Sequence, residues 1–242
     1  MHLVPATAAV VKADARSRRW HEHRKRVRAE IVDAAFRAID RYGPRVSLRE
    51  IAAEAGTAKP KIYRHFTDKA DLFHAIAGRF RDMLWTAIES NVDFAADPAQ
   101  EVLRRSVAEY VGLAERHPNV LRFALAGGFP EPAAPSALAL PEGREVTMAI
   151  AEMFSHQLRD MNLDPAVLEL AAAAAFGVAS AATEWWLGPD ADSPRRIPAG
   201  DFVVHLTTIM LGTVRGTTDL MGVHLDPGLP IGAAVPRSTG VR

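Results

Sequence analysis

Two short helices joined by a turn are indicated by residues 47–66, which read SLREIAAEAGTAKPKIYRHF. Ser47 and Glu50 have the spacing of a capping box, in which the serine hydroxyl and the glutamate carboxylate each accept a hydrogen bond from the other residue's backbone amide. We therefore expect a short helix that starts at Leu48. Gly56 suits the left-handed conformation in which many helices end, so the helix is expected to stop there.

The second helix of the pair is expected from Lys59 to Phe66. Pro60 falls in its first turn, where a missing amide costs least. Ile62 and Phe66 share one face, which we expect to be buried. The opposite face carries basic and polar side chains, namely Thr57, Pro60, Lys61 and Arg64, with Tyr63 and His65 on its flanks. Two short helices of this kind around a Gly-containing turn are what a helix-turn-helix requires.

The same motifs resemble the signature of the TetR family of helix-turn-helix transcriptional regulators, over roughly Ile31 to Ile76. The resemblance implies an all-α fold of about nine helices. A three-helix helix-turn-helix domain at the N-terminus would be followed by an all-helical ligand-binding and dimerisation domain. It also implies a cytoplasmic homodimer that binds a palindromic double-stranded DNA operator, usually as a repressor, and is released by a small-molecule effector. The Ala-rich, Arg-over-Lys composition is typical of a GC-rich bacterial genome.

In proteins of this family the third helix enters the major groove, and its flank and the start of the fourth helix hold phosphates. Lys61 lies early on the recognition helix, where residues approach base edges. Tyr63 and His65 are expected to donate hydrogen bonds to phosphate oxygens, and Lys69 to add charge beside a helix N-terminus. The predicted DNA-binding residues are Arg49, Thr57, Lys59, Pro60, Lys61, Tyr63, Arg64, His65 and Lys69. Ala58 stands where the family often has Ser or Thr, so we assign it no polar contact.

Charge is distributed unevenly along the chain. The formal net charge is zero, but residues 1–81 hold 18 Lys or Arg against 9 Asp or Glu. Residues 82–242 hold 11 against 20, so only the first part is suited to a polyanion. Residues 12–28 contain eight basic and two acidic residues. Such an arm could follow the DNA backbone or enter a minor groove, or it could be a solvated flexible segment, and both interpretations stay open.

Helical periodicity and breakers divide the rest of the chain. Further helices are expected at 26–42, 68–91, 98–117, 118–126, 143–162, 165–187 and 201–221, with an irregular Pro-rich segment at 127–141. The expected domains are a flexible arm (1–25), the helix-turn-helix domain (26–72), the sensing and dimerisation domain (73–221) and a flexible tail (222–242).

The last two helices are the expected dimer interface. Residues 171–182 are mostly small, which permits close helix approach, and by resemblance these helices pair across the two-fold axis as a four-helix bundle. An ordinary intrachain core is the alternative. Apolar side chains on the other helices could line a pocket for an apolar or aromatic effector, although most would serve equally well as core: Phe80, Leu84, Leu103, Val107, Tyr110, Phe123, Met148, Phe154, Phe176, Trp185 and Trp186.

Other classes of function find little support. The chain has no cysteine, no P-loop, no GxGxxG, no GxSxG and no HExxH, so we expect neither an enzyme nor a bound cofactor. His21 and His23 would point apart on a helix, which argues against a metal site. The longest uncharged apolar stretch, 170–183, is short for a membrane span. An architectural or partner-binding DNA protein without ligand sensing remains the alternative function.

Overall fold

The computed structural model describes residues 6–129, 165–190, 192–220, 224–230 and 233, and these residues form helices without β-strands. The helices are α1 (Ala6–Tyr42), α2 (Leu48–Glu54), α3 (Lys59–Ile62), α4 (Lys69–Asn91), α5 (Ala99–Arg116), α6 (Pro118–Leu125), α8 (Pro165–Leu187) and α9 (Ala199–Leu220). The expected all-α fold is confirmed. The helix expected at 143–162, like the Pro-rich segment at 130–141, lies outside the described residues.

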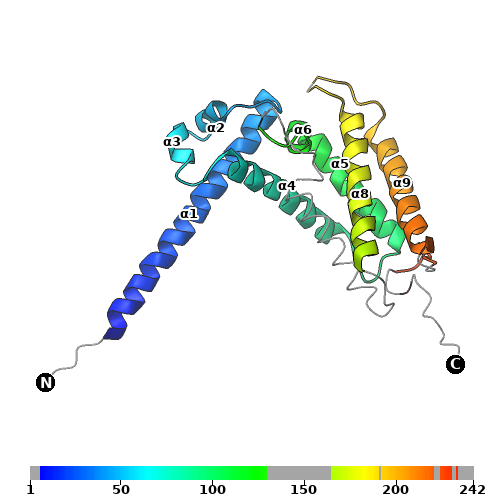
Figure 1. The fold of residues 1–242 in the computed structure, drawn as a ribbon, viewed down its shortest axis with the longest axis horizontal. Coiled ribbons are helices and arrows are strands. Elements are labelled where there is room, and N and C mark those ends of the chain that lie inside the picture. Colours follow the sequence, from blue (N-terminus) through cyan, green and yellow to red (C-terminus); the bar gives the residue numbers. More distant parts are fainter. Residues whose placement is uncertain (1–5, 130–164, 191, 221–223, 231–232, 234–242) are drawn as a thin grey trace.

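The helices form two groups that α4 connects. Figure 1 shows α1, α2 and α3 at one end and α5, α8 and α9 side by side at the other, with α4 running between them. The first group closes around Ile39 of α1, Ile51 of α2 and Ile62 of α3, all of which are fully buried. Phe202 and Leu206 of α9 belong to the same continuous core. The molecule therefore has two helical units that share one apolar interior.

The ends of α2 are set by local sequence. Glu50 N donates to Ser47 Oγ at 3.3 Å, and Ser47 N donates to the Glu50 carboxylate at 2.7 Å. These two bonds confirm the predicted capping box. Gly56 has a φ of +59°, the left-handed conformation expected where the helix ends.

The first helix is much longer than its apolar pattern indicated. α1 begins at Ala6, whereas a start near Arg26 was expected after a flexible arm. Its buried face begins only at Ile31, and side chains 20–26 are exposed. Once the packed part of a helix has formed, each further residue adds a hydrogen bond without a new nucleation cost. The basic segment thus continues the helix although it has no apolar stripe.

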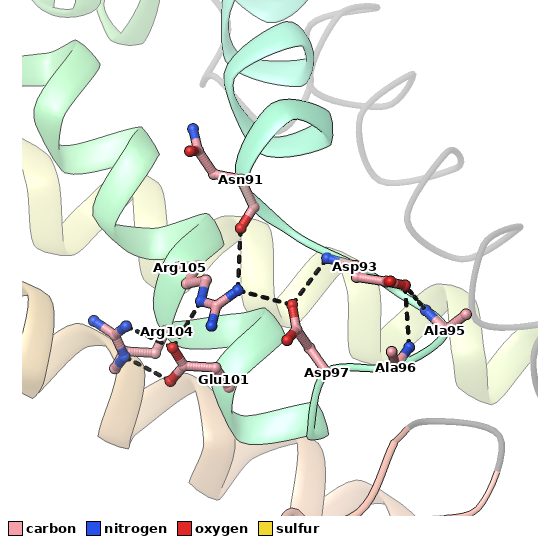
Figure 2. A network of polar contacts seen from close by, with 8 residues as sticks. All are labelled: Asn91, Asp93, Ala95, Ala96, Asp97, Glu101, Arg104 and Arg105. Atoms are coloured by element: carbon pink, nitrogen blue, oxygen red, sulfur yellow. Dashed lines mark hydrogen bonds and ion pairs between the residues drawn. The ribbon is translucent and has the colours of Figure 1, made fainter.

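Arg105 holds the corner at which α4 turns into α5 (Figure 2). Its Nη1 donates to the backbone oxygen of Asn91 at 3.3 Å and to Asp97 Oδ2 at 2.9 Å, and its Nε donates to Glu101 Oε1 at 2.7 Å. Asp97 also accepts from the amide of Asp93 at 2.9 Å. The C-terminal end of α4 is therefore tied to the first turns of α5.

Part of the predicted flexible tail packs against the start of α5. Pro98 precedes α5 and offers no side-chain cap. Instead, Ala99 N donates to the oxygen of Leu229 at 2.8 Å and Gln100 N to the oxygen of Pro227 at 3.0 Å. These carbonyls satisfy two of the amides that every helix leaves unpaired at its N-terminus. The prediction of a flexible tail rested on its Gly and Pro content, which gives no sign of hydrogen bonds to a helix more than 100 residues earlier in the chain.

Candidate nucleic-acid interface

The candidate recognition helix is shorter than predicted. α3 ends at Ile62, and the chain continues through turns to His65 rather than as α-helix to Phe66. Arg64 N donates to Lys61 O, and His65 N donates to Ile62 O, so these bonds span three residues instead of four. Such tight turns are common where a helix ends. Ala58 precedes α3 without a side-chain cap, as its lack of a hydroxyl implied.

Most of the predicted contact residues are exposed to solvent. Ile62 and Phe66 are buried, as expected, and hold this segment against the core. Thr57 and His65 are half-buried. The other seven predicted DNA-binding side chains are exposed: Arg49, Lys59, Pro60, Lys61, Tyr63, Arg64 and Lys69. The structure thus brings together a surface that is basic and rich in hydrogen-bond donors.

Arg28 fastens α1 to the turn between α3 and α4. Its guanidinium donates to the oxygen of His65 at 2.6 Å, forms a bidentate ion pair with Asp71, and lies 4.1 Å from the centre of the Phe66 ring. The hydrogen bonds from Arg28 lower the pKa of Asp71 to about 2. Thr67 N also donates to Asp71 at 2.9 Å. Sequence reasoning missed this clamp because it joins residues far apart in the chain.

The His65 ring is only partly available for the predicted hydrogen bond to a phosphate. Its Nδ1 is buried and has no hydrogen-bond partner among the described residues, so a phosphate contact would have to use Nε2. Burial is the main cause that lowers the pKa of His65. The positive charges of Arg24, Lys61, His23 and Arg28 lower it further. The charges of α1 and α3 therefore disfavour protonation of this ring in the protein without DNA.

The start of α4 already holds a carboxylate. Asp68 caps the helix by accepting from Asp71 N at 2.7 Å. The sequence argument relied on helix amides that attract an anion, but Asp68 occupies part of that site. Lys69 remains exposed at the first position of α4, so its charge is what can attract a phosphate there.

A chain of polar contacts links the DNA-binding unit to α8. Asp40 Oδ2 lies 2.7 Å from His117 Nδ1, and the backbone oxygen of Asp40 accepts from Asn119 Nδ2 at 3.1 Å. Asn119 Oδ1 accepts from Arg122 at 3.3 Å. Arg122 in turn donates to the backbone oxygens at 187 and 188, at 2.6 and 3.2 Å. α1, α6 and the end of α8 are thereby connected through side chains.

The predicted effector-binding residues separate into groups. Phe80, Val107, Phe123 and Trp186 are buried. Leu84, Leu103, Tyr110 and Phe176 are half-buried, and Met148 and Phe154 lie outside the described residues. Trp185 is exposed and carries the guanidinium of Arg196 over its ring. Its neighbour Trp186 instead stacks on Phe202 and donates to the oxygen of Ile197 at 2.8 Å.

Three hydroxyl groups, those of Tyr110, Thr183 and Thr207, lie among or near these apolar side chains. Burial raises the pKa of Tyr110 to about 12, and the nearby Thr183 hydroxyl offsets part of that effect. The Oγ1 atoms of Thr183 and Thr207 are buried without a partner of regular geometry among the described residues. An open cavity of about 810 Å³ lies elsewhere, between residues 42–45, α6 and residues 188–190 and 192–193, and no predicted effector residue lines it.

Comparison with known proteins supports the interpretation of this surface. Residues 31–76 match the family described as bacterial regulatory proteins, tetR family. An uncharacterized HTH-type transcriptional regulator of Mycobacterium tuberculosis is 29% identical over 220 residues, which cover 89% of this chain and 88% of that protein. The HTH-type transcriptional repressor LfrR of Mycolicibacterium smegmatis is 33% identical over 90 residues, or 37% of this chain and 47% of that protein.

Solved structures share the fold. A tetR-family transcriptional regulator from Streptomyces coelicolor superposes with a TM-score of 0.59 at 24% identity, covering 81% of this chain and 83% of that one. The family match spans the buried face of α1, the capped α2, the exposed α3 and the start of α4. Residues 31–76 thus carry the helix-turn-helix of the TetR family of bacterial regulatory proteins, and most of the chain is similar to an HTH-type transcriptional regulator.

Proposed function

We propose that this regulator is a cytoplasmic, bacterial repressor that binds a palindromic operator as a homodimer and leaves it when a small apolar or aromatic effector binds. The observation that carries the proposal is the exposed basic surface of α3, held in place by buried Ile62 and Phe66. Lys61 would read base edges, and Tyr63 and Lys69 would hold phosphates.

The dimer interface is proposed on α8 and α9. By length and composition Glu169–Leu187 could cross a membrane, and only 28% of this stretch is buried within the protomer. One side of α8 packs on α9, with Ala172 and Trp186 buried, so the uncovered apolar surface is one face rather than the whole helix. That geometry favours a second protein surface over lipid. The large apolar side chains exposed on α8 and α9 are Leu170, Trp185, Val204, Ile209 and Leu220.

A second copy is the proposed cover for this face. Added Cβ atoms at Gly177 of α8 and at Gly212 and Gly216 of α9 would meet nothing within 4 Å, so neighbouring backbone could approach closely there. Pairing α8 and α9 about a two-fold axis would place two copies of α3 in successive major grooves, roughly 34–36 Å apart. Symmetry of the protein would then require symmetry of the operator.

The effector is proposed to have an apolar body and one polar group. Leu84 of α4, Leu103 of α5 and Phe176 of α8 are half-buried and supply apolar surface. The hydroxyls of Tyr110 and Thr183 lie together in the same unit and would recognise the polar group. The effector can release DNA only if it binds better to one spacing of the recognition helices than to the other. The contacts from Asp40 to residue 188 give a route by which α8 would bias α1.

The test is quantitative binding to operator DNA, identified by sequencing the sites that the full-length protein protects. Tyr63→Ala and Lys69→Ala are expected to weaken binding to all sequences, whereas Lys61→Ala also relaxes the preference at particular bases. Arg104→Ala removes an exposed cation at the α4–α5 corner and serves as the matched control. Unchanged operator affinity in Tyr63→Ala, Lys69→Ala and Lys61→Ala alike would contradict the proposal.

The same assay distinguishes the proposed repressor from the alternative function, an architectural DNA-binding protein. An architectural DNA-binding protein would protect DNA without a palindrome, and no apolar compound would alter its affinity. A specific palindrome with an affinity that falls in the presence of an apolar ligand supports the proposed repressor. The oligomeric state of Val204→Arg, read by sedimentation, tests the interface: we expect monomers and a large loss of operator affinity.

A further inference from the structure

The first part of α1 extends beyond the rest of the DNA-binding unit. In Figure 1 this part of the helix projects from the body on the side that carries α3. Its side chains from 20 to 26 are exposed, including Trp20 at 57%. An exposed tryptophan on an otherwise polar, basic helix is unusual, because this side chain is generally buried on at least one side. Packing within the protomer does not explain why a tryptophan stands at position 20.

Trp20, Arg24 and Arg28 lie four residues apart and so share one face of α1. Arg28 is fixed to the turn after α3 through His65 and Asp71. Arg24 is one helical turn earlier, about 6 Å along the axis, and continues the same face past that turn. Its guanidinium lies 5.5 Å from the centre of the Trp20 ring, which restricts how it points.

Arg24 differs from the other cations of this part of α1 in its partners. Lys25 pairs with Glu22 at 3.6 Å and Arg26 with Glu30 at 3.7 Å, and Arg28 pairs with Asp71. In the described part of the chain, Arg24 has no carboxylate within ion-pair distance. Among the cations whose charge acts on His65, Arg24 has the largest effect, followed by Lys61 of α3. Arg24 thus adds an unneutralised charge to the field around the recognition helix.

We propose that Arg24, supported by Trp20, makes a second DNA contact, to a backbone phosphate that flanks the groove entered by α3. The contact rests on the proposed operator binding and extends its footprint. DNA is the occupant that the charges favour: an arginine fork pairs with phosphate oxygens, and the cations nearby would repel a basic partner. The indole would lie against the sugar next to that phosphate.

The experiment compares Arg24→Gln with Arg26→Gln in the full-length protein on the same operator duplex. Both substitutions remove one charge from the same helix, but Arg26 lies on nearly the opposite face and is already paired. We expect Arg24→Gln to reduce affinity severalfold and to flatten the plot of log affinity against log salt by about 1.8, since each lost phosphate contact contributes about 0.9 and the dimer has two. Arg26→Gln should change either quantity much less.

Two further measurements sharpen the comparison. Shortening the operator at both ends should remove the difference between wild type and Arg24→Gln, because the flanking phosphate is then missing. Operator binding should also change the emission of the exposed Trp20, and Trp20→Phe should abolish that change while the other three tryptophans remain.

Several outcomes would overturn the inference. Equal effects of Arg24→Gln and Arg26→Gln would show a general charge effect and no contact. Wild-type affinity of Arg24→Gln, on a duplex where Lys61→Ala binds weakly, would remove the second contact and leave the proposed function standing. A loss of self-association in Trp20→Ala would instead assign this face to a second copy of the chain. Failure of the wild-type protein to bind any palindrome would count against the proposed function itself.

Discussion

The two ends of α4 are each held by one arginine, but in different ways. At the start, Arg28 of α1 binds the turn after α3, and Asp71 as well, across 37 to 43 residues of sequence. At the far end, Arg105 binds residues at most 14 positions away. The first contact joins separate helices into one unit, whereas the second shapes a corner that short-range sequence already favours.

This difference assigns α4 to both units of the molecule. Its first turn is fixed to α1 and to the turn after α3 because Arg28, Phe66 and Asp71 form one cluster. Its last turn is tied through Arg105 to α5, which packs against α9. A change in the sensing unit would therefore reach the DNA-binding unit as a displacement of a stiff 23-residue helix. Disrupting the two ends separately should give two distinct phenotypes.

The largest effect is expected where α6 meets the first half of α4. Gly128 has a φ of +88°, and a Cβ there would lie 2.3 Å from the Phe73 ring. Gly128→Ala is expected to destabilise the fold by about 3 kcal/mol, from left-handed strain and overpacking together. Thermal unfolding measures this. Gly78→Ala in α4 is the control, because a Cβ there would make only an ordinary contact with Arg81 at 3.7 Å. It should be neutral or slightly stabilising, since alanine favours helix.

The second-largest effect is expected when the contacts of Arg28 at the start of α4 are removed. Arg28→Ala is expected to lower the free energy of unfolding by about 2 kcal/mol, allowing for solvent around the guanidinium, and to weaken operator binding because the turn after α3 loses its anchor. Chemical denaturation and operator titration give the two values. A stability loss with full operator affinity would show that the clamp does not position α3.

The dependence of stability on acid pH should report on the ion pair between Arg28 and Asp71. The pKa of Asp71 is lowered from 3.8 to about 2, so its ionised form stabilises the fold above about pH 4 and this contribution is lost as pH falls toward 2. In Arg28→Ala the pKa of Asp71 should return toward its ordinary value, and stability should depend less on pH between 4 and 2. An unchanged acid profile would show that Asp71 is not held by Arg28.

A smaller loss of stability is expected when Arg105 is removed at the C-terminal end of α4. Arg105→Ala should lower the melting temperature less than Arg28→Ala does, because Arg105 binds carboxylates only four and eight residues away and joins no distant helices. Operator affinity without effector should stay near that of the wild type, while the effector should become less able to release DNA. Equal loss of operator affinity in the two variants would remove the distinction between the ends of α4.

The smallest effect concerns pH and DNA binding near Arg28. The pKa of His65 lies below 6.5 in the free protein because of burial and surrounding cations. A nearby phosphate would raise it, so binding would take up a proton and affinity should rise severalfold as pH falls from about 7.5 to 6. Titration of wild type and His65→Gln tests this, and parallel slopes would exclude His65. The lowered pKa also makes the fold less stable below about pH 6.5, so the folded fraction must be measured alongside.

The sequence predicted the DNA-binding unit well because its signals are local. The Ser47–Glu50 capping box, the stop at Gly56 and the inward Ile62 and Phe66 each depend on a few neighbouring residues. The length of α1 was underestimated, since residues before Arg26 have no apolar periodicity. α3 was overestimated, because periodicity does not distinguish a helix from the tight turns that follow Ile62.

Contacts that join distant residues could not be predicted. Nothing in the local sequence of Arg28 indicates Asp71 as its partner, and the pair of Asp40 with His117 spans 77 positions. Adjacent Trp185 and Trp186 look equivalent in sequence, yet one is exposed and the other fully buried. Burial of a single side chain depends on the packing angle of a helix, which a linear pattern leaves open.

The carbonyls that reach α5 from the end of the chain bear on how the protein can be shortened or fused. Ala99 and Gln100 lose their partners if the chain stops after Leu220, although every helix described here would still be present. Those amides adjoin Glu101, one of the carboxylates that Arg105 binds. A fusion joined at that point is therefore expected to loosen the connection between α4 and α5 and to weaken the proposed response to an effector, while every proposed DNA-contacting residue stays intact.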